Sequence, residues 1–244
     1  MILNNLKKDK FFQILFFSII TSIIILAIFG KFDARIVPDT SGYIIDSYNK
    51  FSNLWNNKRG PFFGIILCLF KNEYSNYLFF PFFTIIFYFI SIIFLFFSQK
   101  TYGLSSMASL SIPLGLVFSN PLILYSNYIH PELLSITLIV FTISFVILLA
   151  KYKNNKKLLF AIMIFSGLAY LLKPMLIFFI ISLPFLFYTL IKKTKIKSKL
   201  TLTLFIFLVL PFIFVSMVRY ISVKDFNINS FGGYQMSGIA ALMI

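Results

Sequence analysis

Several residue types that carry chemistry in soluble proteins are nearly absent from this chain. Its 244 residues include one cysteine, Cys68, and one histidine, His130. A single cysteine excludes a disulfide within the chain, and one residue of each type excludes a zinc centre built from cysteine and histidine alone. Acidic residues are also scarce, with seven Asp and Glu in all. Any acid–base chemistry must therefore use a small set of carboxylates.

Charge of either sign is rare, and apolar residues replace it. Charged residues make up 12% of the chain and hydrophobic residues 59%, whereas about a quarter of a soluble domain is charged. The net charge of +15 would indicate nucleic acid as the partner of a soluble protein. Here the lysines lie in short clusters between apolar runs, which is typical of cytoplasmic membrane loops. We therefore expect a lipid bilayer as partner, and no nucleic acid.

Seven apolar runs divide the chain into expected membrane spans. A helix needs about 20 apolar residues to cross a bilayer, and these runs have that length or fall a little short of it. The sequence predicts an all-α integral membrane protein, a polytopic helical bundle that forms a single transmembrane domain over residues 1–244. The expected spans are 11–30, 77–97, 104–119, 133–150, 158–172, 175–191 and 200–218.

Two further segments are apolar but do not fit this series of spans. Residues 61–70 are too short to cross a membrane, so we expect a re-entrant or interfacial segment there. The last seven residues, GIAALMI, resemble the start of another apolar run. From that ending we expect a truncated or partial chain.

The distribution of charge predicts the orientation of the bundle. With the N-terminus inside, the expected cytoplasmic segments hold 13 of the 22 basic residues and only Asp9 among the seven acids. Short cytoplasmic loops carry the excess of Lys and Arg. We expect a multi-pass protein of the plasma (inner) membrane with a cytoplasmic N-terminus. The loop 31–60, the connection 120–132 and Lys173 then share the outer face.

The longest polar interval is the expected outer loop 31–60, which contains Asp39 and the only tryptophan, Trp55. Its apolar residues recur at helical spacing, which predicts an amphipathic helix lying in the plane of the headgroups. Asp39 stands at the start of this helix, where it is either a helix cap or a functional carboxylate. The residues of the apolar face are Ile44, Tyr48, Phe51 and Trp55.

Other candidate residues reach the same face from distant parts of the sequence. Glu132 opens the fourth span after His130-Pro131, where the helix dipole alone favours an acid. The functional alternative is that Glu132, with or without His130, faces Asp39 and helps hold the acceptor or a divalent cation. Oxygen-rich sites suit Mg²⁺ or Mn²⁺. Lys173 interrupts an apolar run and Arg59 ends the outer loop. Each of these two is either a membrane-edge anchor or a phosphate ligand.

The order of these motifs resembles the polyprenyl-phosphate-sugar-dependent glycosyltransferases of the C superfamily (GT-C), which include protein mannosyltransferases and lipid A aminoarabinose transferases. Asp39 and Tyr43 match a D-x-x-x-Y element in the first outer loop, and Arg59 begins an R-x-P element. Glu132 matches the acid that opens span four, and Lys173 the basic residue of the G-l-a-x-l-x-R/K-P element that closes span five.

The resemblance covers almost the whole chain, as the N-terminal seven-span module of that superfamily. Three features depart from the family pattern. Thr40 follows Asp39 where protein mannosyltransferases have a paired Asp-Glu, Lys173 replaces the commoner Arg, and the later spans and C-terminal domain are missing.

The resemblance implies an enzyme that transfers a sugar from a polyprenyl-phosphate donor to an unidentified hydroxyl acceptor on the outer face. Asp39 would be the general base, while Arg59, Lys173 and Tyr43 would bind the substrate and its phosphate. Two other classes stay open: a transporter or lipid-linked-oligosaccharide flippase, and a non-catalytic remnant or accessory membrane subunit. Transporters usually place ionisable residues near the bilayer midplane, whereas the charges of this chain crowd toward one face.

Overall fold

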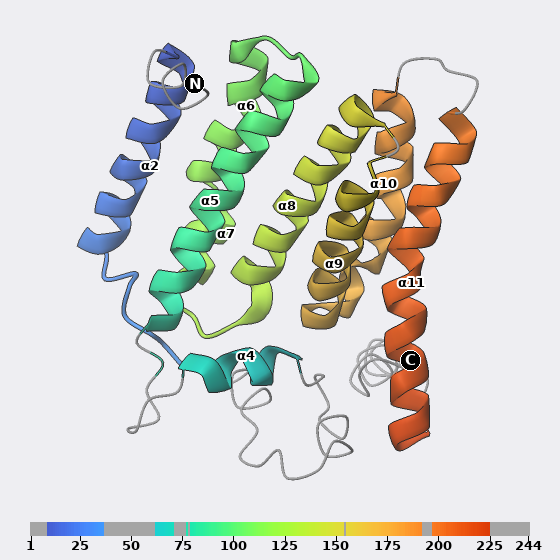
Figure 1. Cartoon of the computed structure of the whole chain (residues 1–244). Coiled ribbons are helices and arrows are strands. Elements are labelled where there is room, and N and C mark those ends of the chain that lie inside the picture. Colours follow the sequence, from blue (N-terminus) through green and yellow to red (C-terminus); the bar gives the residue numbers. More distant parts are fainter. Residues whose placement is uncertain are drawn as a thin grey trace, which may run out of the picture.

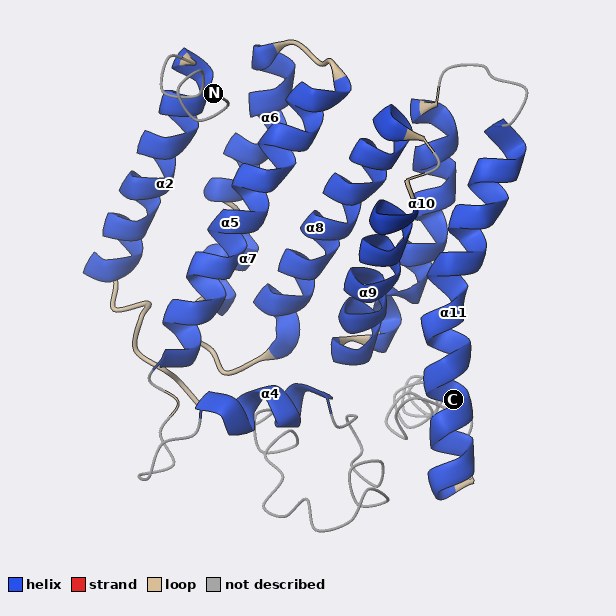
Figure 2. Cartoon of the chain, viewed as in Figure 1, coloured by secondary structure: helices blue, strands red, loops and turns tan. Residues whose placement is uncertain are grey.

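The computed structural model is a bundle of helices (Figure 2). The residues that the structure describes are 9–36, 62–70, 77, 79–153, 155–191 and 197–224. Within these ranges there is no strand, and the one isolated β-bridge joins Arg35 to Tyr128. The prediction of an all-α protein is therefore confirmed for the described part of the chain.

In the described part of the chain, five helical segments are long and apolar enough to cross a membrane. The third of them consists of two helices, α6 and α7, separated by a short break. A bundle of such helices indicates a lipid bilayer environment. The five segments are α2 (Lys10–Ile28), α5 (Phe79–Tyr102), α6 (Ser106–Val117) with α7 (Asn120–Tyr125), α8 (Pro131–Tyr152) and α11 (Lys197–Val223).

Two shorter apolar helices lie where the remaining spans were expected. Helix α9 (Lys156–Leu172) has 17 residues, and α10 (Ile177–Leu190) has 14 and follows a 3-10 turn, η2 (Pro174–Leu176). Both are shorter than the roughly 20 residues of an average transmembrane helix. All seven expected spans thus coincide with helices, but among the described helical segments five have the length of a span.

Helix α8 is the centre of the bundle. In an apolar stretch of 18 residues within α8, 78% of the residues are buried, compared with 22% in α2 and in α11 at the edges. Helix α8 packs against α5 on one side and α9 on the other. Figure 1 shows these helices side by side, with α9, α10 and α11 at one edge. A helix surrounded in this way needs its polar side chains satisfied internally.

The hydroxyl groups of α8 meet this requirement within the helix itself. Thr137, Thr142 and Ser144 have no exposed surface, and each donates to the carbonyl four residues earlier at 2.7–2.8 Å. Because these bonds leave no unpaired donor, α8 can be buried over most of its length at little polar cost.

The third span is interrupted at Phe118 and Ser119. Pro121 in the first turn of α7 has no N–H to continue the preceding helix, so a new helix starts there. Two hydroxyls cap the exposed carbonyls: that of Tyr88 donates to Leu116 O at 3.0 Å, and that of Ser22 to Val117 O at 3.1 Å. The expected span 104–119 therefore continues, after a sealed break, to Tyr125.

Helix α4 (Phe62–Phe70) crosses beneath the ends of the long helices instead of running beside them (Figure 1). It packs against α5 and α9 and buries Phe63 and Leu67, while Leu69 is 79% exposed. This arrangement agrees with the expectation that residues 61–70 do not span. The amphipathic helix expected around Ile44 to Trp55 lies outside the described residues.

Successive long helices run in opposite directions (Figure 1), so the charged residues near their termini lie at two ends of the bundle. We call one the basic end; the other, defined by Asp33, Arg35, His130, Glu132 and Lys173, we call the Glu132 end. Basic side chains at one end and mixed charges at the other form the pattern on which the expected orientation rests. The described lysines of the basic end are Lys10, Lys100, Lys151, Lys153, Lys156, Lys157 and Lys199.

Candidate functional site

A cluster of three ionisable side chains lies at the Glu132 end. Lys173 Nζ donates to Glu132 Oε1 at 2.9 Å, and His130 Nδ1 contacts the other carboxylate oxygen, Oε2. The side chains of Glu132 and His130 are 14% exposed and that of Lys173 is 30% exposed. Residues 41 positions apart thus form one ion-paired site with a partly exposed ammonium group.

The start of α8 determines the position of Glu132. His130 has an extended backbone at the N-cap, Pro131 occupies the first turn, and Glu132 follows it. Proline suits this position because its missing N–H would have no partner there, and the positive end of the helix dipole favours the carboxylate. The local sequence His130-Pro131-Glu132 therefore builds half of the site.

The end of α9 supplies the other half. Lys173 is the C-cap residue, its N–H donates to Ala169 O at 3.0 Å, and its backbone is extended. A residue before proline is disfavoured in the helical region, so Pro174 ends α9 at this lysine. Antiparallel packing of α8 and α9 then brings the two helix ends together.

Burial lowers the pKa of the Lys173 ammonium from its ordinary value of 10.5. Desolvation disfavours the charged form, whereas the ion pair with Glu132 favours it. We take the ion pair to keep Lys173 charged near neutral pH because its geometry is direct, at 2.9 Å. A partly buried cation of this kind interacts more strongly with an anion than one in bulk water.

The chain after α2 is fixed against this site. Gly30 has a φ of +61°, which ends α2 in a left-handed turn. The N–H groups of Gly30 and Lys31 cap the last carbonyls of the helix, those of Ala27 at 3.0 Å and Leu26 at 2.8 Å. After this turn the chain continues to Arg35.

Arg35 pairs through its backbone with the segment that leads into α8. Its N–H donates to Asn127 O at 2.8 Å, and its carbonyl accepts from Ile129 N at 3.0 Å. These two hydrogen bonds make the isolated parallel bridge between Arg35 and Tyr128. The beginning of the expected outer loop is thereby held a few residues from Glu132.

The same connecting segment contains buried polar groups. Ser126 and Asn127 have no exposed surface, and within the described ranges the Ser126 hydroxyl and both polar atoms of the Asn127 side chain have no hydrogen-bond partner. Such groups cost free energy when buried unpaired. Near them, the ring of Tyr125 stacks on that of His130 with centroids 6.5 Å apart.

The structure brings three of the predicted site residues together: Glu132, His130 and Lys173. The other three, Asp39, Tyr43 and Arg59, lie outside the described residues. Sequence reasoning did not single out Arg35 or Asn127. The polar run between α7 and α8 was a signal for Asn127, while the backbone pairing of Arg35 leaves no mark in the sequence.

The expected divalent cation can be tested against the geometry of Glu132. Both carboxylate oxygens already face a nitrogen, that of Lys173 or that of His130. Within the part of the chain that the structure describes, no three His, Cys, Asp or Glu side chains come together. In the described residues Glu132 is the counter-ion of Lys173, and a divalent cation, Mg²⁺ or Mn²⁺, at Glu132 and His130 stays a prediction.

No protein-family model, no curated protein and no solved structure matches the chain. The resemblance to the GT-C superfamily therefore rests on the motifs themselves.

Proposed function

We propose that this protein is a membrane glycosyltransferase that moves a sugar from a polyprenyl-phosphate donor to a hydroxyl acceptor on the outer face. The observation that carries the proposal is the pairing of Lys173 with Glu132 at the end of the bundle where Arg35 anchors the first loop. A partly exposed ammonium at this position suits the phosphate of a lipid whose hydrocarbon chain stays in the bilayer.

Lys173 acts on the leaving group. When the bond between the anomeric carbon and the phosphate oxygen breaks, that oxygen gains negative charge, and a preorganised ammonium stabilises it. A lysine side chain has several rotatable bonds. The ion pair with Glu132 restricts their rotation, so that Lys173 is in position before the donor binds. Arg59 is proposed to bind the same phosphate, and Tyr43 the donor.

Asp39 is the proposed general base. The acceptor hydroxyl attacks the anomeric carbon, its proton passes to the Asp39 carboxylate, and polyprenyl phosphate leaves, which inverts the configuration at that carbon. Asp39 follows the anchored Arg35 by four residues, so the chain keeps the two Cα atoms within about 14 Å. A divalent cation at Glu132 and His130 stays a prediction, and no step is assigned to it here.

The full topology belongs to this proposal. In it, α9 and α10 cross the membrane as the fifth and sixth of seven spans, and the basic end faces the cytoplasm of a plasma membrane. Their lengths of 17 and 14 residues match the lower limit for a span, or fall below it. Neighbouring helices and local thinning of the bilayer accommodate such short segments.

A second candidate function is a transporter or lipid flippase, because the third span is interrupted as helices in transporters are. Interrupted helices in transporters leave carbonyls that coordinate ions. Here the hydroxyls of Tyr88 and Ser22 already occupy the carbonyls of Leu116 and Val117. The sealed break supports a structural role, and the enzyme remains the preferred function.

A transfer assay on the full chain tests the proposal. Purified protein in liposomes receives polyprenyl-phosphate sugars with a radioactive sugar, a panel of lipid and glycan acceptors, and Asp39→Asn, Glu132→Gln and Asp9→Asn variants. We expect transfer by the wild type and Asp9→Asn, and a loss of about 100-fold or more in the other two. Full transfer by Asp39→Asn would show that the base is misassigned. Donor movement across the bilayer without transfer would favour the flippase.

A further inference from the structure

Two aromatic rings meet beside the ion pair of Lys173 and Glu132. The ring of Tyr125 stacks on the imidazole of His130, with centroids 6.5 Å apart and ring planes inclined by 20°. His130 contacts Oε2 of Glu132, and Oε1 of the same carboxylate accepts from Lys173. The four side chains therefore form a chain of contacts from the end of α7 to the end of α9.

The backbone around the two rings is anchored. Between them, Asn127 O accepts from Arg35 N at 2.8 Å, and Ile129 N donates to Arg35 O at 3.0 Å. Helix α7 is held through Leu122, which has no exposed surface. The stacked rings therefore belong to two backbone segments that are each held by other contacts.

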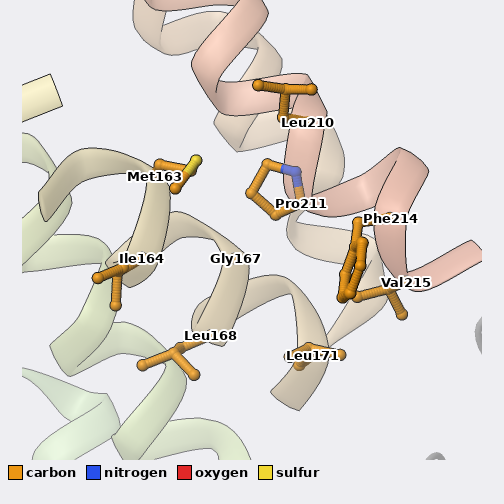
Figure 3. A pocket seen from close by; sticks show the side chains of 9 residues that line it. All are labelled: Met163, Ile164, Gly167, Leu168, Leu171, Leu210, Pro211, Phe214 and Val215. Atoms are coloured by element: carbon orange, nitrogen blue, oxygen red, sulfur yellow. The ribbon is translucent and has the colours of Figure 1, made fainter. Parts of the chain in front are cut away.

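Helix α9, which ends at Lys173, is held by α11 as well as by α8. Gly167 of α9 approaches α11 so closely that a Cβ added there would lie 2.9 Å from Pro211 Cβ. Figure 3 shows this approach among the apolar side chains of the two helices. Because the helices are packed in this way, the remaining freedom of the site lies mainly in its side-chain torsions.

The imidazole of His130 needs more than its backbone to hold its orientation. The χ2 torsion of histidine is broad, so the start of α8 does not by itself aim Nδ1 at Glu132. A nearly parallel ring restricts the rotation, because turning the imidazole would remove the stacking contact. The carboxylate that contacts His130 through Oε2 then presents Oε1 to Lys173.

We propose that Tyr125 is a positioning residue for sugar transfer: its ring holds His130 against Glu132, and Glu132 in that orientation holds Lys173 for the leaving phosphate. This role rests on the proposed function, because it concerns the same ion pair. It also gives the interrupted third span a purpose, since α7 begins after the break and ends at Tyr125. A charged group misplaced by about 1 Å can cost about 100-fold in rate, so an indirect contact matters.

NMR of the imidazole tests the stack without any activity. His130 is the only histidine of the chain, so the full chain labelled with ¹³C,¹⁵N-histidine in detergent micelles gives one set of ring signals. We expect the ring protons to move downfield in Tyr125→Leu, because the ring current of Tyr125 is lost, but not in Tyr125→Phe. Tyr152→Leu is the matched control, since Tyr152 is exposed at the basic end.

The ¹⁵N signal of Nδ1 reports the contact with the carboxylate. We expect Tyr125→Leu to shift this signal in the same direction as Glu132→Gln does, because both variants lose the contact between Nδ1 and the Glu132 carboxylate. Tyr125→Phe and Tyr152→Leu should leave it unchanged.

Sugar transfer then shows whether this orientation matters. We expect kcat to fall about tenfold in Tyr125→Leu with little change in KM, since Lys173 acts when the bond to the phosphate breaks. Tyr125→Phe and Tyr152→Leu should keep the wild-type rate. In a His130→Leu background, Tyr125→Leu should cause no further loss, because the stack acts through the imidazole.

Two outcomes would overturn this role of Tyr125. If the His130 signals are the same in Tyr125→Leu and in the wild type, the imidazole does not depend on the stack. If the signals move while kcat stays unchanged, the orientation of His130 does not govern transfer. A wild type that transfers no sugar would refute the proposed function instead, and the Nδ1 signal of Tyr125→Leu would then decide whether Tyr125 holds His130 on Glu132.

Discussion

The two ends of the bundle each contain a carboxylate paired with a lysine, and the two pairs are almost equally buried. At the basic end the side chain of Asp9 is 13% and that of Lys100 30% exposed. At the Glu132 end the values are 14% for Glu132 and 30% for Lys173. Burial and residue type therefore do not distinguish the two ion pairs.

The bonds around each carboxylate do distinguish them. Asp9 caps α2 by accepting from Phe11 N at 3.0 Å and from Phe12 N at 3.4 Å, and it also joins α2 to α5 through Lys100. Helix formation and packing explain this residue completely. Because these contacts all serve the fold, we propose no role in sugar transfer for Asp9.

Glu132 makes no comparable cap. The N-cap of α8 is His130, without a side-chain capping bond, and the Glu132 carboxylate contacts two basic side chains instead. The unpaired amide of Asn127 lies five residues away in sequence. The contacts of Glu132 with two basic side chains are the reason why we propose the functional site at this end.

The contrast between the two ends is wrong if Lys173 and Lys100 contribute equally to sugar transfer. We expect Lys173→Met to lower sugar transfer by about 100-fold, because the leaving phosphate loses a preorganised cation. Lys100→Met should stay within about twofold, since Lys100 lies at the opposite end. Initial rates in liposomes with equal amounts of folded protein provide the measurement. Equal losses in the two variants would refute the assignment.

The two carboxylates should also differ in their contribution to stability. Glu132→Gln leaves Lys173 and His130 facing each other without an anion, which we expect to cost about 1–3 kcal/mol for a pair that is only partly buried. Asp9→Asn should cost less than about 1 kcal/mol, because asparagine caps a helix as well as aspartate does. Denaturant unfolding in detergent micelles measures both. A larger loss for Asp9→Asn would reverse the comparison.

Asn127→Leu is expected to raise the stability of the protein and to lower its activity. Leucine keeps the branched shape of the asparagine side chain with larger methyl groups and removes two unpaired polar atoms, so we expect a gain of about 1 kcal/mol in the free energy of unfolding. Sugar transfer should fall in the same variant if the amide binds substrate. Thermal unfolding and the transfer assay decide this together. Unchanged transfer would leave Asn127 without a catalytic role.

The smallest expected effect is on the alkaline side of the pH profile. Burial lowers the pKa of Lys173, so the ammonium loses its proton below the ordinary value. Activity should be retained below that lowered pKa and fall as the pH rises through it. Lys173→Arg should move the fall to higher pH, because guanidinium stays protonated. An identical alkaline limb in both proteins would show that another group controls it.

The positions of the helices were predictable because apolar runs and prolines act locally. Each expected span coincides with a helix, and Pro174 ends α9 at the lysine that the motif indicates. The expected third span ended at 119, whereas in the structure α7 follows α6 to Tyr125, after a break at which the hydroxyls of Tyr88 and Ser22 donate to the carbonyls of Leu116 and Val117. Tyr88 lies on α5 and Ser22 on α2, so these hydrogen bonds cannot be predicted from the sequence of the third span alone.

Half of the candidate site was also predictable. The sequence identified Glu132 and Lys173 and placed them at one face, since charge alternation tracks the direction of each helix. The contacts of Glu132 with Lys173 and His130 came only from the structure, and the expected divalent cation stays a prediction. Which partner a carboxylate takes depends on distances of a few ångströms that no local pattern encodes.

The sequence by itself determined that this is a helical protein suited to a lipid bilayer, because hydropathy is a sum over each run of residues along the chain. Only the tertiary structure decided that Asp9 serves its own helix while Glu132 holds Lys173, and that Arg35 ties the first loop to the segment before α8. Each of these contacts depends on which helices pack together, and that choice is made by the whole bundle.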